Sequence, residues 1–189
     1  MRTWIYKRSH TGDPHPRIGI FGYRDCEKTH RGRQYDAVLG IWGATNWDGD
    51  SSRAYKLSWI GTCIHRLIFD DELVQVLTSR IHDKLHEKWS WKGTHILAFE
   101  HFKYYANGYD LGAATNLVDR MYPVRTGGMM SPNLPERVQQ EVDMLLKLAE
   151  DANPSACLNE FKELESVQHT LPKDEWINRV ASLLDLTLT

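Results

Sequence analysis

An apolar stretch at residues 35–43, YDAVLGIWG, constrains the fold of this chain more than any other feature. Alternate side chains of an extended strand point to opposite faces. Ala37, Leu39 and Ile41 therefore share one face, while Val38 and Trp42 lie on the other. Both faces are apolar, which is typical of a strand buried inside a sheet. The stretch predicts a central strand that is covered on both sides.

Local patterns predict the other elements. Strands are expected at 2–8, 17–25, 54–64 and 94–106, the last of them closed by the turn signal Asn107-Gly108. Helical periodicity predicts helices at 72–89, from Pro135 to Ala149, at 155–167 and, with Asp174 as its cap, at 175–186. The fold class expected is mixed α/β, with a central mixed sheet and flanking helices. Residues 1–133 are expected to form the body of a single domain, and residues 134–189 a helical C-terminal lobe packed on it.

Charge is distributed unevenly along the 189 residues, although the net charge is only −2. Residues 1–35 carry eight basic against three acidic side chains, whereas residues 134–189 carry five against eleven. This asymmetry predicts that any polyanion binds the first part of the chain. The alternative is that one solvated face is basic without a partner.

Other bulk features concern the compartment. No apolar run approaches the length of a spanning helix, and the start lacks the apolar region of a signal peptide. The three cysteines lie far apart, so reduced thiols are expected. These features predict a cytoplasmic protein without a membrane partner.

The connection RSHTGDPHPRIGIFGYRDC, residues 8–26, gathers the most chemistry in one place. Asp13 and His15 each precede a proline, which biases both to extended backbone and leaves a semi-rigid loop that presents a carboxylate with an imidazole. Such a pair can stabilise positive charge on a sugar and hydrogen-bond a departing group. His10 and Asp25 bracket the loop and are further catalytic candidates. The alternative is that Asp13 and His15 only make turn hydrogen bonds.

Two short resemblances point to nucleobases. The stretch GDPHPRIGIFG resembles the water-activating loop of the uracil-DNA glycosylase superfamily. This resemblance implies that Asp13 holds the catalytic position and Phe21 lies near the base-stacking position. The stretches YDAVLGIWG and AYKLSWIGTC are similar to the paired strands of PUA-like domains of the EVE and ASCH types, whose pockets hold a nucleobase. Small domains of this kind occur beside prokaryotic DNA-modification and anti-phage genes.

Further candidates come from single motifs. In WGATNW, Trp42, Asn46 and Trp47 could hold an extruded base by stacking and amide hydrogen bonds, although Trp42 also suits the core. Glu100 interrupts an apolar strand face, and burial there would raise its pKa and make it a general acid or base. The alternative is that Glu100 is solvated.

The basic residues near the opening loop are the expected phosphate contacts. They are Arg24, Lys28, Arg31 and Arg33, with Arg125 of the RTGG segment as a further one. His82 and His86 have a metal-chelating spacing, but no third ligand is evident nearby, and Cys63-x-His65 is a weak half-site. Neither a metal nor a small-molecule cofactor is therefore expected.

Three functions follow from these features. The first is a DNA-binding hydrolase, plausible in anti-phage defence, that flips a modified base and cleaves its N-glycosidic bond. The second is a non-catalytic PUA-like reader of such a base. The third is a metal-dependent nuclease, which lacks any acidic or histidine motif of recognised spacing. DNA is the expected partner in all three, and the oligomeric state is left open.

Overall fold

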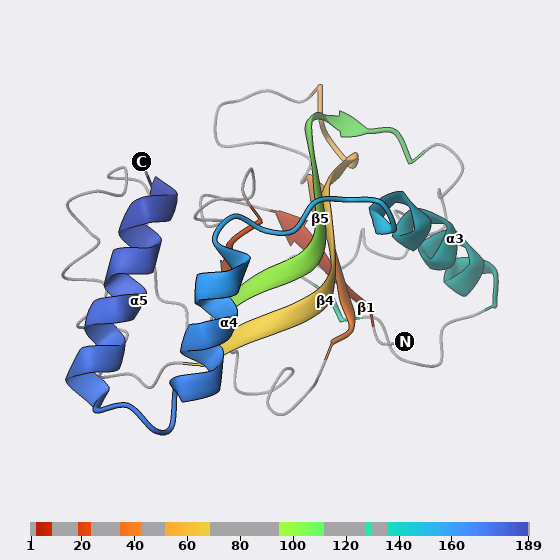
Figure 1. Ribbon diagram of the computed structural model, residues 1–189. Coiled ribbons are helices and arrows are strands. Elements are labelled where there is room, and N and C mark those ends of the chain that lie inside the picture. Colours follow the sequence, from red (N-terminus) through yellow and green to blue (C-terminus); the bar gives the residue numbers. More distant parts are fainter. Residues whose placement is uncertain are drawn as a thin grey trace. The chain divides into compact units, whose positions relative to one another are not determined.

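The fold is mixed α/β, as the sequence predicts. A computed structural model (Figure 1) describes residues 3–8, 19–23, 35–42, 52–68, 95–111, 128–129 and 136–188. The chain divides into two compact units, each drawn from three separate segments. The first unit takes residues 1–10, 32–64 and 101–153, and the second takes residues 11–31, 65–100 and 154–189.

The first unit contains a mixed sheet with the strand order β5-β4-β3-β1-β6. Its strands are β1 (Thr3–Arg8), β3 (Ala37–Trp42), β6 (Gly128–Met129), and the parts of β4 (Leu57–Ile68) and β5 (His95–Tyr109) that lie within residues 57–64 and 101–109. β1 runs parallel to β3, while β4 is antiparallel to β3 and β6 is antiparallel to β1. All six residues of β3 are buried, which confirms the central strand predicted from its two apolar faces.

A close approach of backbone to an indole sets the register between β3 and β4. Gly40 lies opposite Trp59, and the register shifts between Gly40 and Ile41. A Cβ atom on Gly40 would overlap the buried Trp59 ring. Glycine is therefore the residue that lets the large ring lie across the neighbouring strand.

The core of the first unit forms between this sheet and one helical segment. That segment is α3 (Glu136–Leu146), followed by the short 3-10 helix η2 (Lys147–Ala149). The core cluster consists of Ala37, Leu39, Ile41, Leu57, Ile60, Leu111, Val142, Leu145, Leu146 and Ala149. Burial of Val142, Leu145 and Ala149 on one side of the segment confirms the predicted apolar stripe.

The second unit has a separate core. It contains β2 (Phe21–Tyr23), antiparallel to β5, the parts of β4 and β5 that lie within residues 65–100, and the helices α4 (Leu158–Val167) and α5 (Lys173–Leu188). Its buried cluster consists of Ile20, Leu67, Ile96, Ala98, Phe161, Leu164, Trp176, Ile177, Val180 and Leu183. Figure 1 shows α4 and α5 lying along one another.

Several element ends differ from the sequence predictions. β5 runs through Asn107-Gly108 to Tyr109, because Gly108 takes the positive φ of 75° while the strand continues. The predicted end of this strand was therefore wrong. α5 begins at Lys173, so Asp174 lies in the first turn and is not the cap.

The helices after residue 133 are divided between the two units. α3 belongs to the first unit, whereas α4 and α5 belong to the second. Among the described helices, none combines the length and the apolar character that crossing a membrane requires.

Candidate functional site: a histidine between two glutamates

Most of the residues predicted from sequence lie outside the described residues. These are His10, Asp13, His15, Arg24, Asp25, Lys28, Arg31, Arg33, Asn46, Trp47 and Arg125, and the helix expected at 72–89 with His82 and His86. Their predicted roles stay predictions. The described ones are Phe21, whose backbone pairs with Leu97 between β2 and β5, and Trp42 and Glu100.

Trp42 has the environment of a core residue. Its side chain is only 3% exposed, and the Arg53 guanidinium lies 4.4 Å from the centre of its ring. A cation over the ring face is a favourable contact within the protein. This environment favours the core interpretation of Trp42 over the base-stacking one.

Glu100 lies on β5 in a position that the burial argument did not anticipate. Its side chain is 39% exposed. The pKa of its carboxyl is lowered from the ordinary 4.5, first by the hydrogen bond with His65 and then by the hydrogen bond and charge of Lys162. The rise in pKa that burial would cause does not occur, because Glu100 is partly exposed and the partners of the carboxylate outweigh its small desolvation. Glu100 is an ionised group at neutral pH.

His65 connects Glu100 to a second carboxylate. Its Nε2 lies 3.2 Å from Glu100 Oε1, and its Nδ1 lies 2.7 Å from Glu165 Oε2. Ionised carboxylates only accept hydrogen bonds, and a neutral imidazole has one N–H. Both hydrogen bonds can therefore form at once only when the ring carries two protons. The arrangement presents a proton donor directly beside an ionised carboxylate.

Helix α4 supplies two further charged residues, Lys162 and Glu165, that contact Glu100 and His65. Lys162 and Glu165 are three residues apart, so they lie on neighbouring positions of one helical face. The Lys162 Nζ lies 3.1 Å from Glu100 Oε1, and the backbone N–H of Arg66 donates to Glu165 Oε1 at 2.8 Å. Figure 1 shows α4 beside the ends of β4 and β5 that belong to the second unit. Glu165 is thus held by two donors from β4 and orients the imidazole.

The buried core of the second unit and the Ser155 hydrogen bond fix the positions of α4 and β5. Phe161 and Leu164 of α4 are buried in the second core, so the polar residues that directly follow them, Lys162 and Glu165, are carried to its rim. On β5, the residue before Glu100 is anchored by Ser155, whose hydroxyl accepts a hydrogen bond from the Phe99 N–H at 2.8 Å. The core thus holds both the strand and the helix that carry the charged groups.

The cluster, defined as His65, Glu100, Lys162 and Glu165, is open enough to meet a ligand. Its side chains are 21% exposed for His65, 46% for Lys162 and 35% for Glu165. An exposed ionised carboxylate can stabilise a cation, and an imidazole beside it can exchange a proton with a bound group.

Sequence reasoning identified Glu100 but missed its partners. His65 was considered only with Cys63, and Lys162 and Glu165 looked like ordinary charges on a helix. His65 and Glu165 are separated by 100 positions, and only the packing of α4 on the strands brings them together. The one local signal is the Lys162-Glu165 spacing beside the buried stripe of α4.

Comparisons of the chain with protein-family models, with characterised proteins and with solved structures gave no match.

Proposed function

We propose that the protein hydrolyses the N-glycosidic bond of a nucleobase in DNA, with a modified base as the substrate. The observation that carries this proposal is the ionised Glu100 carboxylate, held beside a histidine that can donate a proton. Cleavage of an N-glycosidic bond needs these two groups, because positive charge develops on the sugar and negative charge on the departing base.

Each member of the cluster has a role in the proposed step. The bond between the sugar C1′ and the base nitrogen breaks, and Glu100 stabilises the cationic sugar. His65 gives its Nε2 proton to the departing base, and Glu165 holds the ring through Nδ1. Water then bonds to C1′ and loses a proton to a carboxylate, for which the resemblance to the glycosylase loop suggests Asp13.

The substrate class is supported by charge and by resemblance. Residues 1–35 carry a net charge of +5, which suits binding to phosphates and predicts an affinity that falls steeply with salt. Both sequence resemblances concern nucleobases, and PUA-like domains occur beside DNA-modification and anti-phage genes. A cytoplasmic protein that removes modified bases from incoming DNA is consistent with these features.

The test is the formation of abasic sites in phage DNA that carries modified cytosines. Glu100→Gln preserves the shape of the side chain but removes its charge, and we expect it to slow base release by about 100-fold or more, the scale for losing one electrostatic stabiliser. Asp13→Asn is expected to have an effect of the same order.

Glu163→Gln is the matched control. Glu163 is also an exposed glutamate of the second unit that is paired with a cation, since its Oε1 lies 2.6 Å from Arg179. We expect this variant to release bases at the wild-type rate. Equal rates for Glu100→Gln and wild type would remove Glu100 from the mechanism. Tight DNA binding without abasic sites in the wild type would contradict the hydrolase and favour the non-catalytic reader.

A further inference from the structure

The first unit contains a cleft whose lining includes none of the four residues of the His65, Glu100, Lys162 and Glu165 cluster. Its volume is about 610 Å³, and α3 and η2 form part of its wall. Apart from Tyr35, its ionisable lining consists of Asp36, Cys63, His101, Asp143, Lys147 and Glu150. A thiol, an imidazole and three carboxylates thus meet one basic side chain, so the cleft has an excess of acidic groups.

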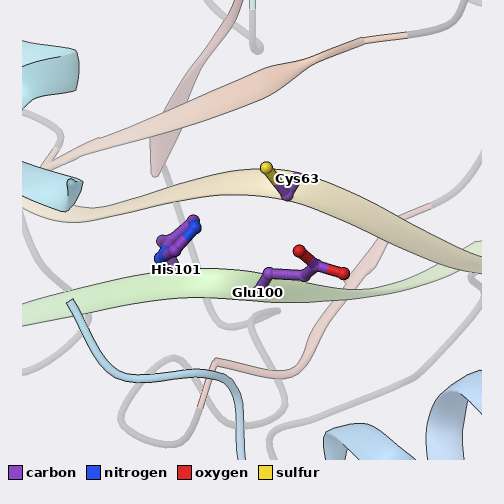
Figure 2. A group of neighbouring side chains, drawn as sticks. All are labelled: Cys63, Glu100 and His101. Atoms are coloured by element: carbon purple, nitrogen blue, oxygen red, sulfur yellow. The ribbon is translucent and has the colours of Figure 1, made fainter. Parts of the chain in front are cut away.

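Cys63 and His101 are neighbours in this cleft. Figure 2 shows Cys63 on β4 and His101 on the adjacent strand β5. The Cys63 Sγ and a ring nitrogen of His101 lie within 4.8 Å of one another. Cys63 is exposed and His101 is partly exposed, so both can be reached from solvent.

The backbone of Cys63 is unusual for a strand residue. Its φ is 55°, a conformation that glycine adopts freely and other residues adopt with strain. The described pairing of β4 with β3 ends at Thr62, one residue earlier. The positive φ therefore falls where the ladder with β3 ends, and Cys63 lines the cleft.

We propose that Cys63 and His101 bind a divalent cation of the zinc class in this cleft. Thiolate and imidazole ligands select zinc and related ions, whereas magnesium and calcium prefer sites built from oxygen alone. With Zn–S near 2.3 Å and Zn–N near 2.0 Å, tetrahedral geometry places sulfur and nitrogen about 3.6 Å apart. The two ligand atoms lie at most 4.8 Å apart, so a small side-chain rotation brings them to this separation, and water completes the coordination.

The sequence did not predict this site. The expectation of no metal considered pairs that are close in sequence, such as His82 with His86 and Cys63 with His65. Cys63 and His101 are 38 positions apart and meet because β4 and β5 are adjacent in the sheet.

Metal binding is tested on the full chain, stripped with a chelator and titrated with Zn²⁺ against a chromophoric indicator. We expect one tight site in the wild type and at least a tenfold loss of affinity in Cys63→Ser and in His101→Ala. With Co²⁺ in place of zinc, the wild type should show a sulfur-to-metal band in the near ultraviolet that Cys63→Ser lacks.

Two further variants separate the loss of a metal ligand from a loss of folding. Cys157→Ser is the matched control, because Cys157 has nearly the same backbone conformation, with a φ of 54°, but lies in the second unit. It should keep both the affinity and the cobalt band. Cys63→Gly suits the local backbone, so it should stay folded by circular dichroism and still lose the band. Absence of zinc uptake by the wild type, or wild-type affinity in Cys63→Ser, would overturn the proposal.

Discussion

Replacing Ser155 by alanine should destabilise the second unit far more than the loss of one oxygen atom suggests. Ser155 is 3% exposed. Its hydroxyl accepts a hydrogen bond from the Phe99 N–H at 2.8 Å and donates one to the Gly19 carbonyl at 2.7 Å. A buried polar group that loses its partner costs about 1–3 kcal/mol. Because the Phe99 N–H and the Gly19 carbonyl both lose their partner, we expect Ser155→Ala to lower the free energy of unfolding by about 2–6 kcal/mol.

Urea unfolding followed by tryptophan fluorescence measures this loss. Ser166→Ala is the control, since its exposed hydroxyl donates to the Glu163 carbonyl at a similar distance of 2.7 Å. Water can replace that exposed hydrogen bond, so the control should change the free energy of unfolding by less than about 0.5 kcal/mol. A Ser155→Ala variant as stable as Ser166→Ala would refute the idea that this hydroxyl holds β5 to its neighbours.

Three further predictions concern other parts of the fold and the cluster. Gly40→Ala places a methyl group against the buried Trp59 ring and should cost about 1–3 kcal/mol in urea unfolding, whereas wild-type stability would show that the ring can move freely. Trp176→Phe removes the indole N–H that donates to the Leu164 carbonyl at 2.9 Å, and should cost about 1–3 kcal/mol by the same measurement; no loss would contradict a structural role for that hydrogen bond. Since the pKa of Glu100 is lowered in the folded state, its stabilising effect is present above pH 4.5 and is lost as pH falls through the lowered pKa. The stability difference between wild type and Glu100→Gln, measured by urea unfolding at several pH values, should therefore shrink on acidification, and a constant difference would contradict this.

Local pattern in the sequence determined the main elements of this protein. The two apolar faces of residues 37–42 predicted a buried strand, and β3 is buried at every residue. Apolar residues at helical spacing predicted the segments that became α3 and α4, with Phe161 and Leu164 facing the core. These predictions succeed because the buried positions of a strand or helix recur at a fixed spacing. The repeat of apolar residues can therefore be recognised within a dozen residues of sequence.

Tertiary structure alone decided the division into units and the chemistry at the surface. α3 joins a different core from α4 and α5, although all three follow one another along the chain. His65 meets Glu165 across 100 positions, and Cys63 meets His101 across the β4–β5 pairing. Local sequence patterns cannot predict such contacts, because each contact depends on which strands become neighbours and on which helix covers them. The same packing lowered the pKa of Glu100, since the partners of a charged side chain, and not its place in an apolar stretch, determine which protonation state is stabilised.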